Sequence, residues 1–572
     1  MTYSNTYSST SSPTNFIPFS GMGMRKGGRA TMMPSNYQGD GSTLNLDFTT
    51  GVLDSRLTFS RASTATFVNS QGYVEYAGAN LILQSNNFST YWTKNTLTVA
   101  SSSGTAPDGS NSFRVTGSGA DAIQQAVSNA VSHTCSIWMK SNTGANQTVR
   151  GYTTGALSDI FTVTSVWQLF TWTIPSTSAW GWFYLYFAAS SDVLIWNAQA
   201  NPGSTAQTYY PTTTAAYHAP RFDYSPTNIG EPRGLLIETQ AVNLATNSTF
   251  SSGWLGGSNV TTAFNTLDVL DPAGTNTATK CTLANSTFCS KFESVSGLAA
   301  STTYTWSYWI RGTAGNTQRI YSVTAAADLV TQTAYTYSTS GWTRVTTTFT
   351  TTAAVTQAYI YPINRNSGVG EVLYIWGAQV ELGSGASSYI PTGASTVTRN
   401  ADNCSMYDTT LTGSLSWLKN ATQGTFFIEA TKRFSGTTFA GALFGTEATA
   451  TKDFMLYQAI GNNWLSFNWG GDNITNYTAL SAPFLIKAAV ALSAGTPAPD
   501  ADNMVSINGT NSALNTASNV ALPFATNIFC IGSRAAASGS VPSQNYADSA
   551  IRRIKFFPTA LTAAQLNALT TP

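Results

Sequence analysis

The stretch "IWGAQVELGSGASSYIPT" at residues 375–392 has a near copy, "IWNAQANPGSTAQTYYPT", at residues 195–212. The two share ten of eighteen positions at a constant offset of 180. Around each copy, apolar residues alternate with polar ones over short runs bounded by Gly, Pro, Asn and Ser, as in "TCSIWMKSN" and "TRVTTTFTTT". A period of two with frequent turns is typical of antiparallel strands. We therefore predict two β-sandwich units of the jelly-roll kind.

The repeat extends over nearly the whole of each unit, and it sets the expected domain boundaries. "SIWMK" at 136–140 corresponds to "SYWIR" at 307–311, for example. We place the first sandwich at 80–213 and the second at 243–398, with linker segments at 46–79 and 214–242. We expect Trp196 and Trp376, in the last strands of the two units, to belong to the cores.

After residue 398 the alternation continues without a third copy. Five pieces read as strands: "GTFFIEATKRF", "FMLYQAI", "NWLSFNWGG", "FLIKAAVALSAG" and "NMVSINGT". The final piece, "IRRIKFFPTALTAAQLNALTTP", reads as a strand followed by a short helix. Thr562 is a suitable N-cap, and Leu561, Leu566 and Leu569 have helical spacing. Residues 399–572 should thus form a third sandwich, with the helix covering one end, so the fold class is all-β.

Composition restricts the class of partner. Charged residues make up 9% of the 572 residues, against roughly 25% in a typical soluble protein. The formal net charge is +1 without a dense Lys/Arg run, which argues against nucleic acid. No stretch reaches the roughly 18 apolar residues that span a bilayer, and the first residues lack the basic and apolar regions of a secretory signal. We expect neither membrane insertion nor export.

The cysteines also indicate that the chain is made and folded in the reducing cytoplasm. The five cysteines, Cys135, Cys281, Cys289, Cys404 and Cys530, form no CxxC pair, and an odd, sparse set is unsuited to a disulfide framework. We expect reduced, buried thiols. A neutral surface rich in hydroxyl and amide groups suits a protein that faces the outside. A protein assembled in the cytoplasm and released by lysis would satisfy both observations.

The opening residues 1–45 are rich in Gly, Ser and Thr, a composition typical of a flexible tail. They also contain "NFIPFSGMGM" and "ATMMPSNY", whose apolar residues a tail does not need. We expect an arm that becomes ordered against a neighbouring subunit, with plain disorder as the alternative.

Several stretches resemble proteins of tailed-bacteriophage virions. "LTFSRASTATFVNSQGYVEYAGAN" (57–80) and "APRFDYSPTNIGEPRGLLIETQAVNLATNSTFSSGW" (219–254) resemble the linker before carbohydrate-binding-module-like sandwiches in tail fibres. "GAQVELGSGASSYIPTGASTVTRNAD" (377–402) resembles the end of those modules, and "IRRIKFFPTALTAAQLNAL" (551–569) resembles the end of a concanavalin A-like, laminin-G-type lectin domain. In the first half, "FSRASTATF" is followed almost at once by the sandwich, without the "RFDY…GLLIE" portion.

The resemblance implies a tail fibre or tail-tip protein located in the virion. Residues 1–45 would attach to other tail or capsid proteins, the assembly would be a homotrimer, and the sandwiches would adsorb to host cell-surface polysaccharide. An architectural component, such as a head fibre, capsid decoration or tail sleeve without glycan binding, is the alternative. The lectin-like domain leaves room for a structural calcium ion, although the sequence has no DxDxDG-type loop to place one.

Catalytic chemistry has few residues to draw on. The two histidines, His133 and His218, are far apart in sequence, which disfavours a His-based triad or a multi-His metal site. Glycoside hydrolysis needs two placed carboxylates, but the ExDxxE pattern expected of concanavalin-like glucanases is absent and Glu429 stands alone. We expect Glu429 at an exposed strand position. We predict no catalytic residue, no cofactor and no enzyme activity.

Binding chemistry is better supplied, by "AWGWFYLYFAA" at 179–189. Alternation puts Phe183, Leu185 and Phe187 on one face of a strand, which should be core. The other face carries Trp180, Trp182, Tyr184 and Tyr186. Such a row can stack on sugar rings while its N–H and O–H groups bond their hydroxyls. The alternative is that a neighbouring domain or subunit buries this face.

Two further candidate glycan sites follow from the same reasoning. The second unit keeps Tyr359 and Tyr361 but has Val355 and Gln357 where the tryptophans would be, so its binding should be weaker or different. In the third sandwich, Trp469 precedes Gly470-Gly471 at an expected turn, with Asp472 beside it.

Overall fold

The computed structural model gives an all-β architecture, as the sequence predicts. It describes residues 40–572 except 95, 103, 128–130, 153–158, 176–180, 252–253, 255, 285–287, 367, 433–440, 447–453, 459–464, 470–471, 476–483, 494–503, 514–525, 537–541 and 545. Most of the predicted N-terminal arm therefore lies outside the described residues. In the described part of the chain, no helix is long and apolar enough to cross a membrane.

Sandwich 1 consists of two antiparallel five-stranded sheets, with strand orders β13-β10-β15-β8-β7 and β12-β11-β14-β9-β6. The strands are β6 (Thr93–Lys94), β7 (Thr98–Ser102), β8 (Ser112–Thr116), β9 (Asp121–Ala126), β10 (His133–Ser141), β11 (Gln147–Gly151), β12 (Asp159–Val163), β13 (Gln168–Ile174), β14 (Trp182–Phe187) and β15 (Asp192–Pro202). Between the sheets lies an apolar core that includes Phe88, Ile137 and Phe183, all fully buried.

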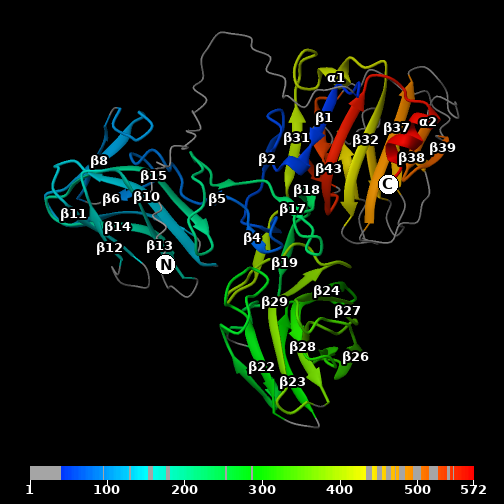
Figure 1. The fold of residues 1–572 in the computed structure, drawn as a ribbon, viewed down its shortest axis with the longest axis horizontal. Coiled ribbons are helices and arrows are strands. Elements are labelled where there is room, and N and C mark those ends of the chain that lie inside the picture. The colour runs from blue at the N-terminus through cyan, green and yellow to red at the C-terminus, as the bar shows by residue number, and fades with distance from the viewer. Residues whose placement is uncertain are drawn as a thin grey trace, which may run out of the picture. The chain divides into compact units, whose positions relative to one another are not determined.

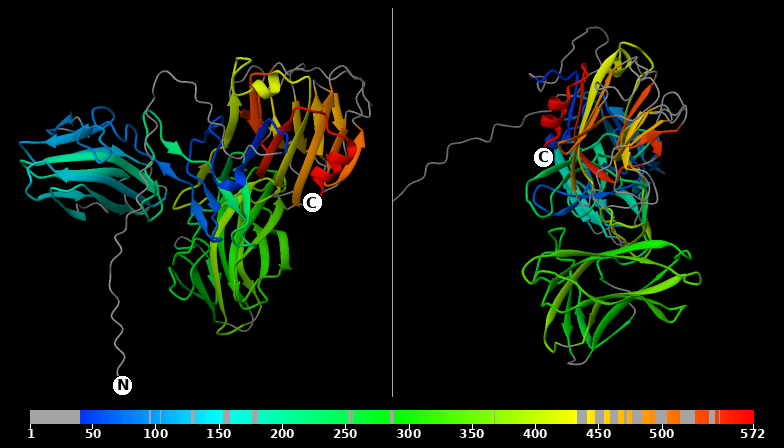
Figure 2. Two further views of the ribbon diagram at one scale, coloured as in Figure 1. Left: turned by 45° about the horizontal axis from the view of Figure 1, so that its top comes forward. Right: turned by 90° about the vertical axis from the view of Figure 1, so that its right-hand side faces the viewer.

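Sandwich 2 repeats this plan, with strand orders β20-β23-β28-β25-β26 and β21-β22-β29-β24-β27. Its strands are β20 (Gly256–Ser258), β21 (Val260–Ala263), β22 (Thr279–Leu283), β23 (Cys289–Ser296), β24 (Thr303–Gly312), β25 (Thr317–Ser322), β26 (Ala327–Ala334), β27 (Thr343–Thr350), β28 (Gln357–Arg365) and β29 (Val372–Leu382). The right-hand view of Figure 2 shows its two layers edge-on, in green. Trp306 and Tyr308 fill the core between them.

The repeated stretch of the sequence lies on β15 and β29, but its tryptophans do not belong to the main cores. In β15, Ile195 and Ala198 both belong to the core, so a bulge intervenes, and Asn197 has a left-handed φ of 52°. Trp196 is therefore turned outward and is half-buried. Trp376 also lies outside the main core, in a small cluster with Tyr389, where it is 3% exposed. The expectation of a core position is therefore confirmed for Trp376, which is buried in this smaller cluster. It is wrong for Trp196, because alternation cannot anticipate a bulge.

The third sandwich pairs a seven-stranded sheet, β2-β31-β40-β33-β34-β35-β36, with an eight-stranded sheet, β17-β18-β43-β32-β37-β38-β39, in which β1 also pairs with β43. Its early strands are β1 (Leu44–Asp47), β2 (Thr58–Ser60), β17 (Phe222–Tyr224) and β18 (Pro232–Ile237). The others are β31 (Asn403–Tyr407), β32 (Gln423–Lys432), β33 (Gly441–Gly445), β34 (Phe454–Gln458), β35 (Leu465–Trp469), β36 (Asp472–Thr475), β37 (Phe484–Ser493), β38 (Met504–Ile507), β39 (Thr510–Ala513), β40 (Ile528–Ile531) and β43 (Ser549–Phe557).

Segments expected to be linkers thus supply strands to the third sandwich. β1 pairs with β43 from Leu44↔Phe556 to Asp47↔Arg553, and β2 pairs with β31. β18 pairs with the first residues of β43, from Leu235↔Ile551 to Ile237↔Ser549. Figure 1 shows β1 and β2, in blue, and β17 and β18, in green, beside the yellow to red strands of the C-terminal part. Sandwiches 1 and 2 are consequently insertions into a third sandwich whose strands come from three separate parts of the chain.

Short elements complete the fold. The 3-10 helix η1 (Phe48–Thr50) follows β1, and α1 (Ser416–Lys419) precedes β32. Two-stranded pairs join β3 (Thr66–Val68) to β4 (Val74–Tyr76), β5 (Ala79–Asn80) to β16 (Tyr217–His218), β19 (Ala241–Asn243) to β30 (Val397–Arg399), and β41 (Arg534–Ala535) to β42 (Pro542–Gln544). The β5–β16 and β19–β30 pairs bring together the two ends of each inserted sandwich.

The terminal helix, α2 (Ala563–Thr570), begins where the sequence predicts. Thr562 caps it, and the reciprocal bond from Gln565 completes a capping box. Leu566 is fully buried against the outer side of the eight-stranded sheet, beside Phe427. The helix therefore covers a face of the sandwich and not an end. The amphipathic pattern identifies the buried stripe of a helix but not the surface that receives it.

Two expectations about polar and sulfur side chains have opposite outcomes. All five cysteines are free and buried, which confirms the prediction of buried thiols. Glu429 is only 6% exposed, so the expectation of an exposed position is wrong. Its carboxylate oxygens lie 3.4 Å from nitrogens of Arg552 and Arg553, and these arginines on the neighbouring strand compensate the buried charge.

Five charged side chains meet in the interior where the inserted sandwiches join the third one. They are Arg61, Arg221, Glu238, Arg399 and Asp402, whose side chains are at most 1% exposed. Asp402 pairs with Arg61 at 2.8 Å and also with Arg221. Glu238 pairs with Arg221 at 2.7 Å and also with Arg399. Burial lowers the pKa of Arg61 to about 10, so it stays charged at neutral pH. We call this set the junction cluster.

Acid is expected to destabilise the fold through its two histidines. His133 and His218 are buried, and burial lowers the pKa of each to about 4, with the charge of Arg61 adding to the effect at His218. The unfolded value is about 6.5. Their stabilisation is therefore fully present above about pH 6.5 and is lost as the pH falls towards about 4, by on the order of 3 kcal/mol per histidine.

Thermal unfolding followed across this pH window tests the histidine prediction. Because carboxylates titrate over part of the same range, the comparison is between the natural chain and His133→Gln. The variant should show a shallower loss of stability with falling pH. Identical slopes in the two proteins would contradict the prediction.

Candidate functional site

The strand predicted to carry aromatic residues, β14, shows the expected alternation. Phe183, Leu185 and Phe187 are fully buried in the core of sandwich 1. Trp182, Tyr184 and Tyr186 point to the other side and are half-buried. β14 lies in the middle of its sheet, between β9 and β11. The outer surface of this sheet therefore presents an aromatic row at its centre. Trp180 lies outside the described residues.

Neighbouring strands contribute further side chains to this outer surface. Tyr152, which follows β11, has its ring centroid 5.6 Å from that of Tyr184. Arg150 of β11 is exposed and lies opposite Tyr186 in the register. On the other side, Gln124 of β9 lies opposite Tyr184. Partial burial, with a smaller effect of the nearby charge of Asp121, raises the pKa of Tyr184, so its hydroxyl keeps its proton at neutral pH and can donate a hydrogen bond.

In sandwich 2 the corresponding outer surface is more closed. Tyr359 is half-buried and Tyr361 is 8% exposed. The ring of Phe292 lies 4.8 and 4.9 Å from the two tyrosine rings. Phe292 in turn lies against Gly256, where a Cβ would come within 1.9 Å of the ring. A larger residue at 256 would displace Phe292, so the glycine lets the aromatic side chains pack over one another.

An arginine completes this cluster. The guanidinium of Arg319 lies 5.2 Å from the ring centre of Tyr321 and 5.1 Å from that of Tyr361. Its Nε donates to the Oδ1 of Asp328 at 2.8 Å. Gln357 occupies the position that Trp182 has in sandwich 1, and its amide donates to Ser294 at 2.5 Å. The two sandwiches thus share tyrosines at this surface but differ in what surrounds them.

The third set of predicted residues lies on another domain. Trp469 ends β35 and Asp472 begins β36, and the register pairs the two residues directly. Both therefore lie at facing ends of neighbouring strands in the seven-stranded sheet. Their side chains lie outside the described part of the structure. The predicted glycan-binding residues are therefore distributed over three sandwiches and do not form one site.

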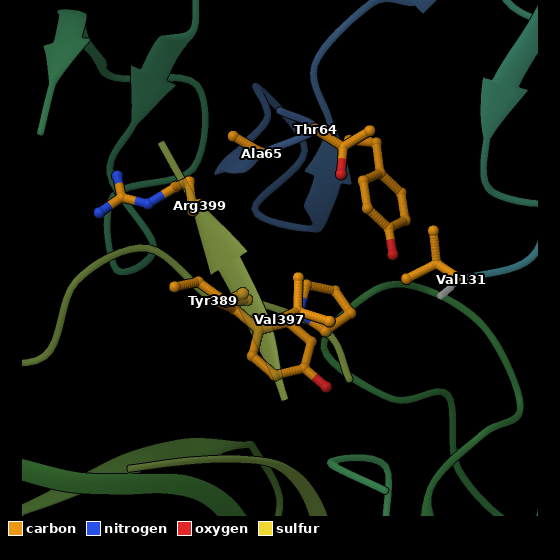
Figure 3. A pocket seen from close by; sticks show the side chains of 9 residues that line it. Thr64, Ala65, Val131, Tyr389, Val397 and Arg399 are labelled. Carbon is orange, nitrogen blue, oxygen red and sulfur yellow. The ribbon is translucent and has the colours of Figure 1, made fainter. Parts of the chain in front are cut away.

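A separate pocket lies near the junction cluster (Figure 3). Thr64, Ala65, Tyr389, Val397 and Arg399 contribute to its lining. Figure 3 shows the guanidinium of Arg399 directed away from the other labelled side chains, in keeping with its bond to Glu238. Among the described lining residues there is no carboxylate or histidine. The pocket thus offers apolar packing between segments and not a reactive group.

Sequence reasoning missed several residues of the aromatic surfaces: Arg150, Tyr152, Phe292, Arg319 and Tyr321. The signal was present, because "TVRGY" and "TQRIY" at 148–152 and 317–321 both place Arg and Tyr two residues apart. Residues two apart on a strand face the same way. The strand neighbours that bring them beside the tyrosines of β14 and β28 are set by non-local pairing.

No protein-family model matches the chain, and no curated protein matches it. Among solved structures, the CBM40 of a Ruminococcus gnavus sialidase bound to α2,3-sialyllactose is 16% identical, with a TM-score of 0.22, and the match covers 29% of this chain and 91% of that one. Tandem CBM22 domains from Paenibacillus barcinonensis are 12% identical, with a TM-score of 0.21, and the match covers 56% of this chain and 100% of that one.

A further similar structure also contains two modules. Tandem CBM51 modules of a family 98 glycoside hydrolase from Streptococcus pneumoniae are 10% identical, with a TM-score of 0.16, and the match covers 58% of this chain and 94% of that one. At these identities and TM-scores, the likeness carries no argument about ligand or activity. The case for a function rests on the surfaces of the chain itself.

Proposed function

We propose that this chain is a structural protein of a tailed-phage virion, a tail fibre or tail-tip protein, that adsorbs to glycans of the host surface. In this proposal, residues 1–45 attach it to other tail or capsid proteins and the chain assembles as a homotrimer. It binds without catalysing a reaction and without a cofactor. Several weak glycan sites on one particle then add up by avidity.

The observation that carries the glycan-binding part of the proposal is the row formed by Trp182, Tyr184 and Tyr186. Three half-buried aromatic side chains lie side by side on the outer surface of a central strand. Their rings can stack on the C–H faces of sugar rings, and the indole N–H and phenol O–H groups can bond sugar hydroxyls. A rigid sheet holds the row in place, so little conformational freedom is lost on binding.

A glycan-binding measurement on the full chain tests this part. The chain and the double variant Trp182→Ala/Tyr184→Ala are compared on an array of bacterial surface polysaccharides. We expect the variant to bind at least about tenfold more weakly, because each aromatic anchor contributes on the order of 1–2 kcal/mol. Tyr407→Ala is the matched control, since Tyr407 is 49% exposed on the third sandwich. Equal binding by the double variant and the control would exclude the row as the site.

One observation favours the architectural alternative. In sandwich 2 the equivalent aromatic side chains cover one another, and Tyr361 is 8% exposed, which suits packing as well as binding. A competition experiment distinguishes the two functions: the purified chain is added to host cells, and the rate of phage adsorption is measured. A purely architectural component (head fibre, capsid decoration or tail sleeve) would leave that rate unchanged. A receptor-binding fibre would slow adsorption in proportion to the glycan sites that it occupies.

A further inference from the structure

Both inserted sandwiches carry the same four side chains at equivalent surface positions. Arg150 lies opposite Tyr186 in the β11–β14 register, as Arg319 lies opposite Tyr361 in the β25–β28 register. The ring contact between Tyr152 and Tyr184 corresponds to the one between Tyr321 and Tyr359, with centroids 5.6 and 6.4 Å apart. We call each set of one arginine and three tyrosines the quartet.

The quartets are identical although the residues beneath them differ. The core-facing residues of β11 and β14 in sandwich 1 can be compared with those at the equivalent positions of β25 and β28 in sandwich 2. Naming the sandwich 1 residue first, the pairs are Val149 and Gln318, Gly151 and Ile320, Phe183 and Ala358, Leu185 and Ile360, and Phe187 and Pro362. Packing normally constrains core positions more tightly than surface positions. Here every core-facing pair has changed, and so has the neighbouring outward pair, Trp182 and Gln357, whereas the four positions of the quartet have not. Packing beneath the strands therefore does not account for the identity of the quartet.

The side chains of the quartet indicate the chemistry of what binds there. Tyrosine rings offer faces for sugar rings and hydroxyls for sugar hydroxyls. A guanidinium adds a rigid fork of N–H donors that matches the two oxygens of a carboxylate. The net charge of the chain is only +1, so attraction to an anionic ligand has to come from such local groups and not from the overall field.

The arginine is in a different state in each quartet. Arg150 is exposed and forms no ion pair with any residue in the described part of the chain. Arg319 is paired with Asp328, and the two side chains are 24% and 27% exposed. The register places Asp328 opposite Tyr321, so its carboxylate lies beside the quartet of sandwich 2. A carboxylate of the chain itself thus occupies Arg319 but leaves Arg150 available.

We propose that the quartet is a site for a saccharide that bears a carboxylate, such as a hexuronic acid residue. The site of sandwich 1 is open, and Asp328 holds the site of sandwich 2 closed by occupying its arginine. This inference rests on the proposed glycan-binding function and adds the class of sugar, the residue that selects it, and a second, latent site.

The test uses the full chain with polygalacturonate, alginate and hyaluronan, each in its native form and after chemical reduction of the carboxyl groups. Reduction keeps the sugar ring and removes the charge. We expect at least one native polysaccharide to bind about tenfold more tightly than its reduced form, because the reduced form cannot accept charge-assisted hydrogen bonds from the guanidinium. Arg150→Gln should remove this difference by weakening the binding of the native form about tenfold.

The second site is tested by freeing Arg319. Asp328→Asn should increase the number of acidic saccharides bound per chain from one to two, as measured by titration calorimetry. The matched control is Asp268→Asn, which removes the same charge from sandwich 2. Asp268 pairs at 2.7 Å with Lys280, which is a residue of β22 in the opposite sheet. The control should leave the stoichiometry at one.

The outcomes distinguish this inference from the proposed function. Equal binding of native and carboxyl-reduced polysaccharides would overturn the acidic-sugar inference but leave glycan binding in place. A stoichiometry of one in Asp328→Asn would overturn the latent site. If neither these polysaccharides nor the bacterial array shows any binding, both the inference and the glycan-binding function are wrong.

Discussion

A fragment limited to residues 399–572 is expected not to fold cooperatively, although it contains most strands of the third sandwich. The chain before it supplies six core side chains that are at most 7% exposed: Leu44, Leu46, Phe48, Leu57, Leu235 and Ile237. Burying that many large apolar side chains contributes on the order of 10 kcal/mol, which is comparable to the whole stability of a typical domain. Without β1 and β18, β43 would also expose part of its hydrogen-bonding edge.

A shortened chain provides the control for this prediction. The ends of sandwich 1 meet at Tyr217↔Asn80, and those of sandwich 2 meet at Asn243↔Val397. Each inserted sandwich can therefore be replaced by an Asn-Gly turn between paired strands. We expect this shortened chain to give one sharp thermal transition by circular dichroism, and the 399–572 fragment to give none. A sharp transition in the fragment would show that the early strands are dispensable.

Replacement of Asp402 by alanine is expected to be the most destabilising change of a single polar side chain. It leaves Arg61 and Arg221 buried without their shared carboxylate, and the backbone N–H of Glu238 loses an acceptor at 2.9 Å. Breaking a buried ion pair from one side costs about 3–5 kcal/mol because the remaining charge is uncompensated. Denaturant unfolding monitored by far-ultraviolet circular dichroism measures the loss.

A surface ion pair gives the comparison for Asp402→Ala. Asp268 and Lys280 are 43% and 32% exposed, and exposed pairs of this kind contribute about 0–1 kcal/mol. Asp268→Ala should therefore change stability by less than about 1 kcal/mol. If the two substitutions had similar effects, the junction cluster would not be the stabilising network that its burial indicates.

The junction cluster also explains why the third sandwich tolerates two large insertions. Its arginines come from before sandwich 1, between the two sandwiches and after sandwich 2, at Arg61, Arg221 and Arg399. Two carboxylates, Glu238 and Asp402, bind all three. The three parts of the chain are therefore fixed to one another at the point where each inserted sandwich departs and returns.

The amino-acid sequence by itself determined the local structure of this protein. Alternation in 179–189 correctly separated the core side of β14 from its aromatic side, and Thr562 correctly marked the start of α2. These features depend on neighbours a few residues away, which a sequence shows directly. The internal repeat likewise revealed two similar all-β units, because duplicated strands keep their pattern.

Only the tertiary structure decided which distant segments pair. β1 pairs with β43 across some 500 residues of chain. The sequence of a short run such as 44–48 does not show whether it is a linker or a strand, because its pairing partner lies far away in the chain. The bulge at Trp196, the ion pairs of Glu429 and the arginine beside each tyrosine row have the same origin. Each depends on register between strands that are remote in sequence, and strand pairing at a distance leaves no periodic signal in either partner alone.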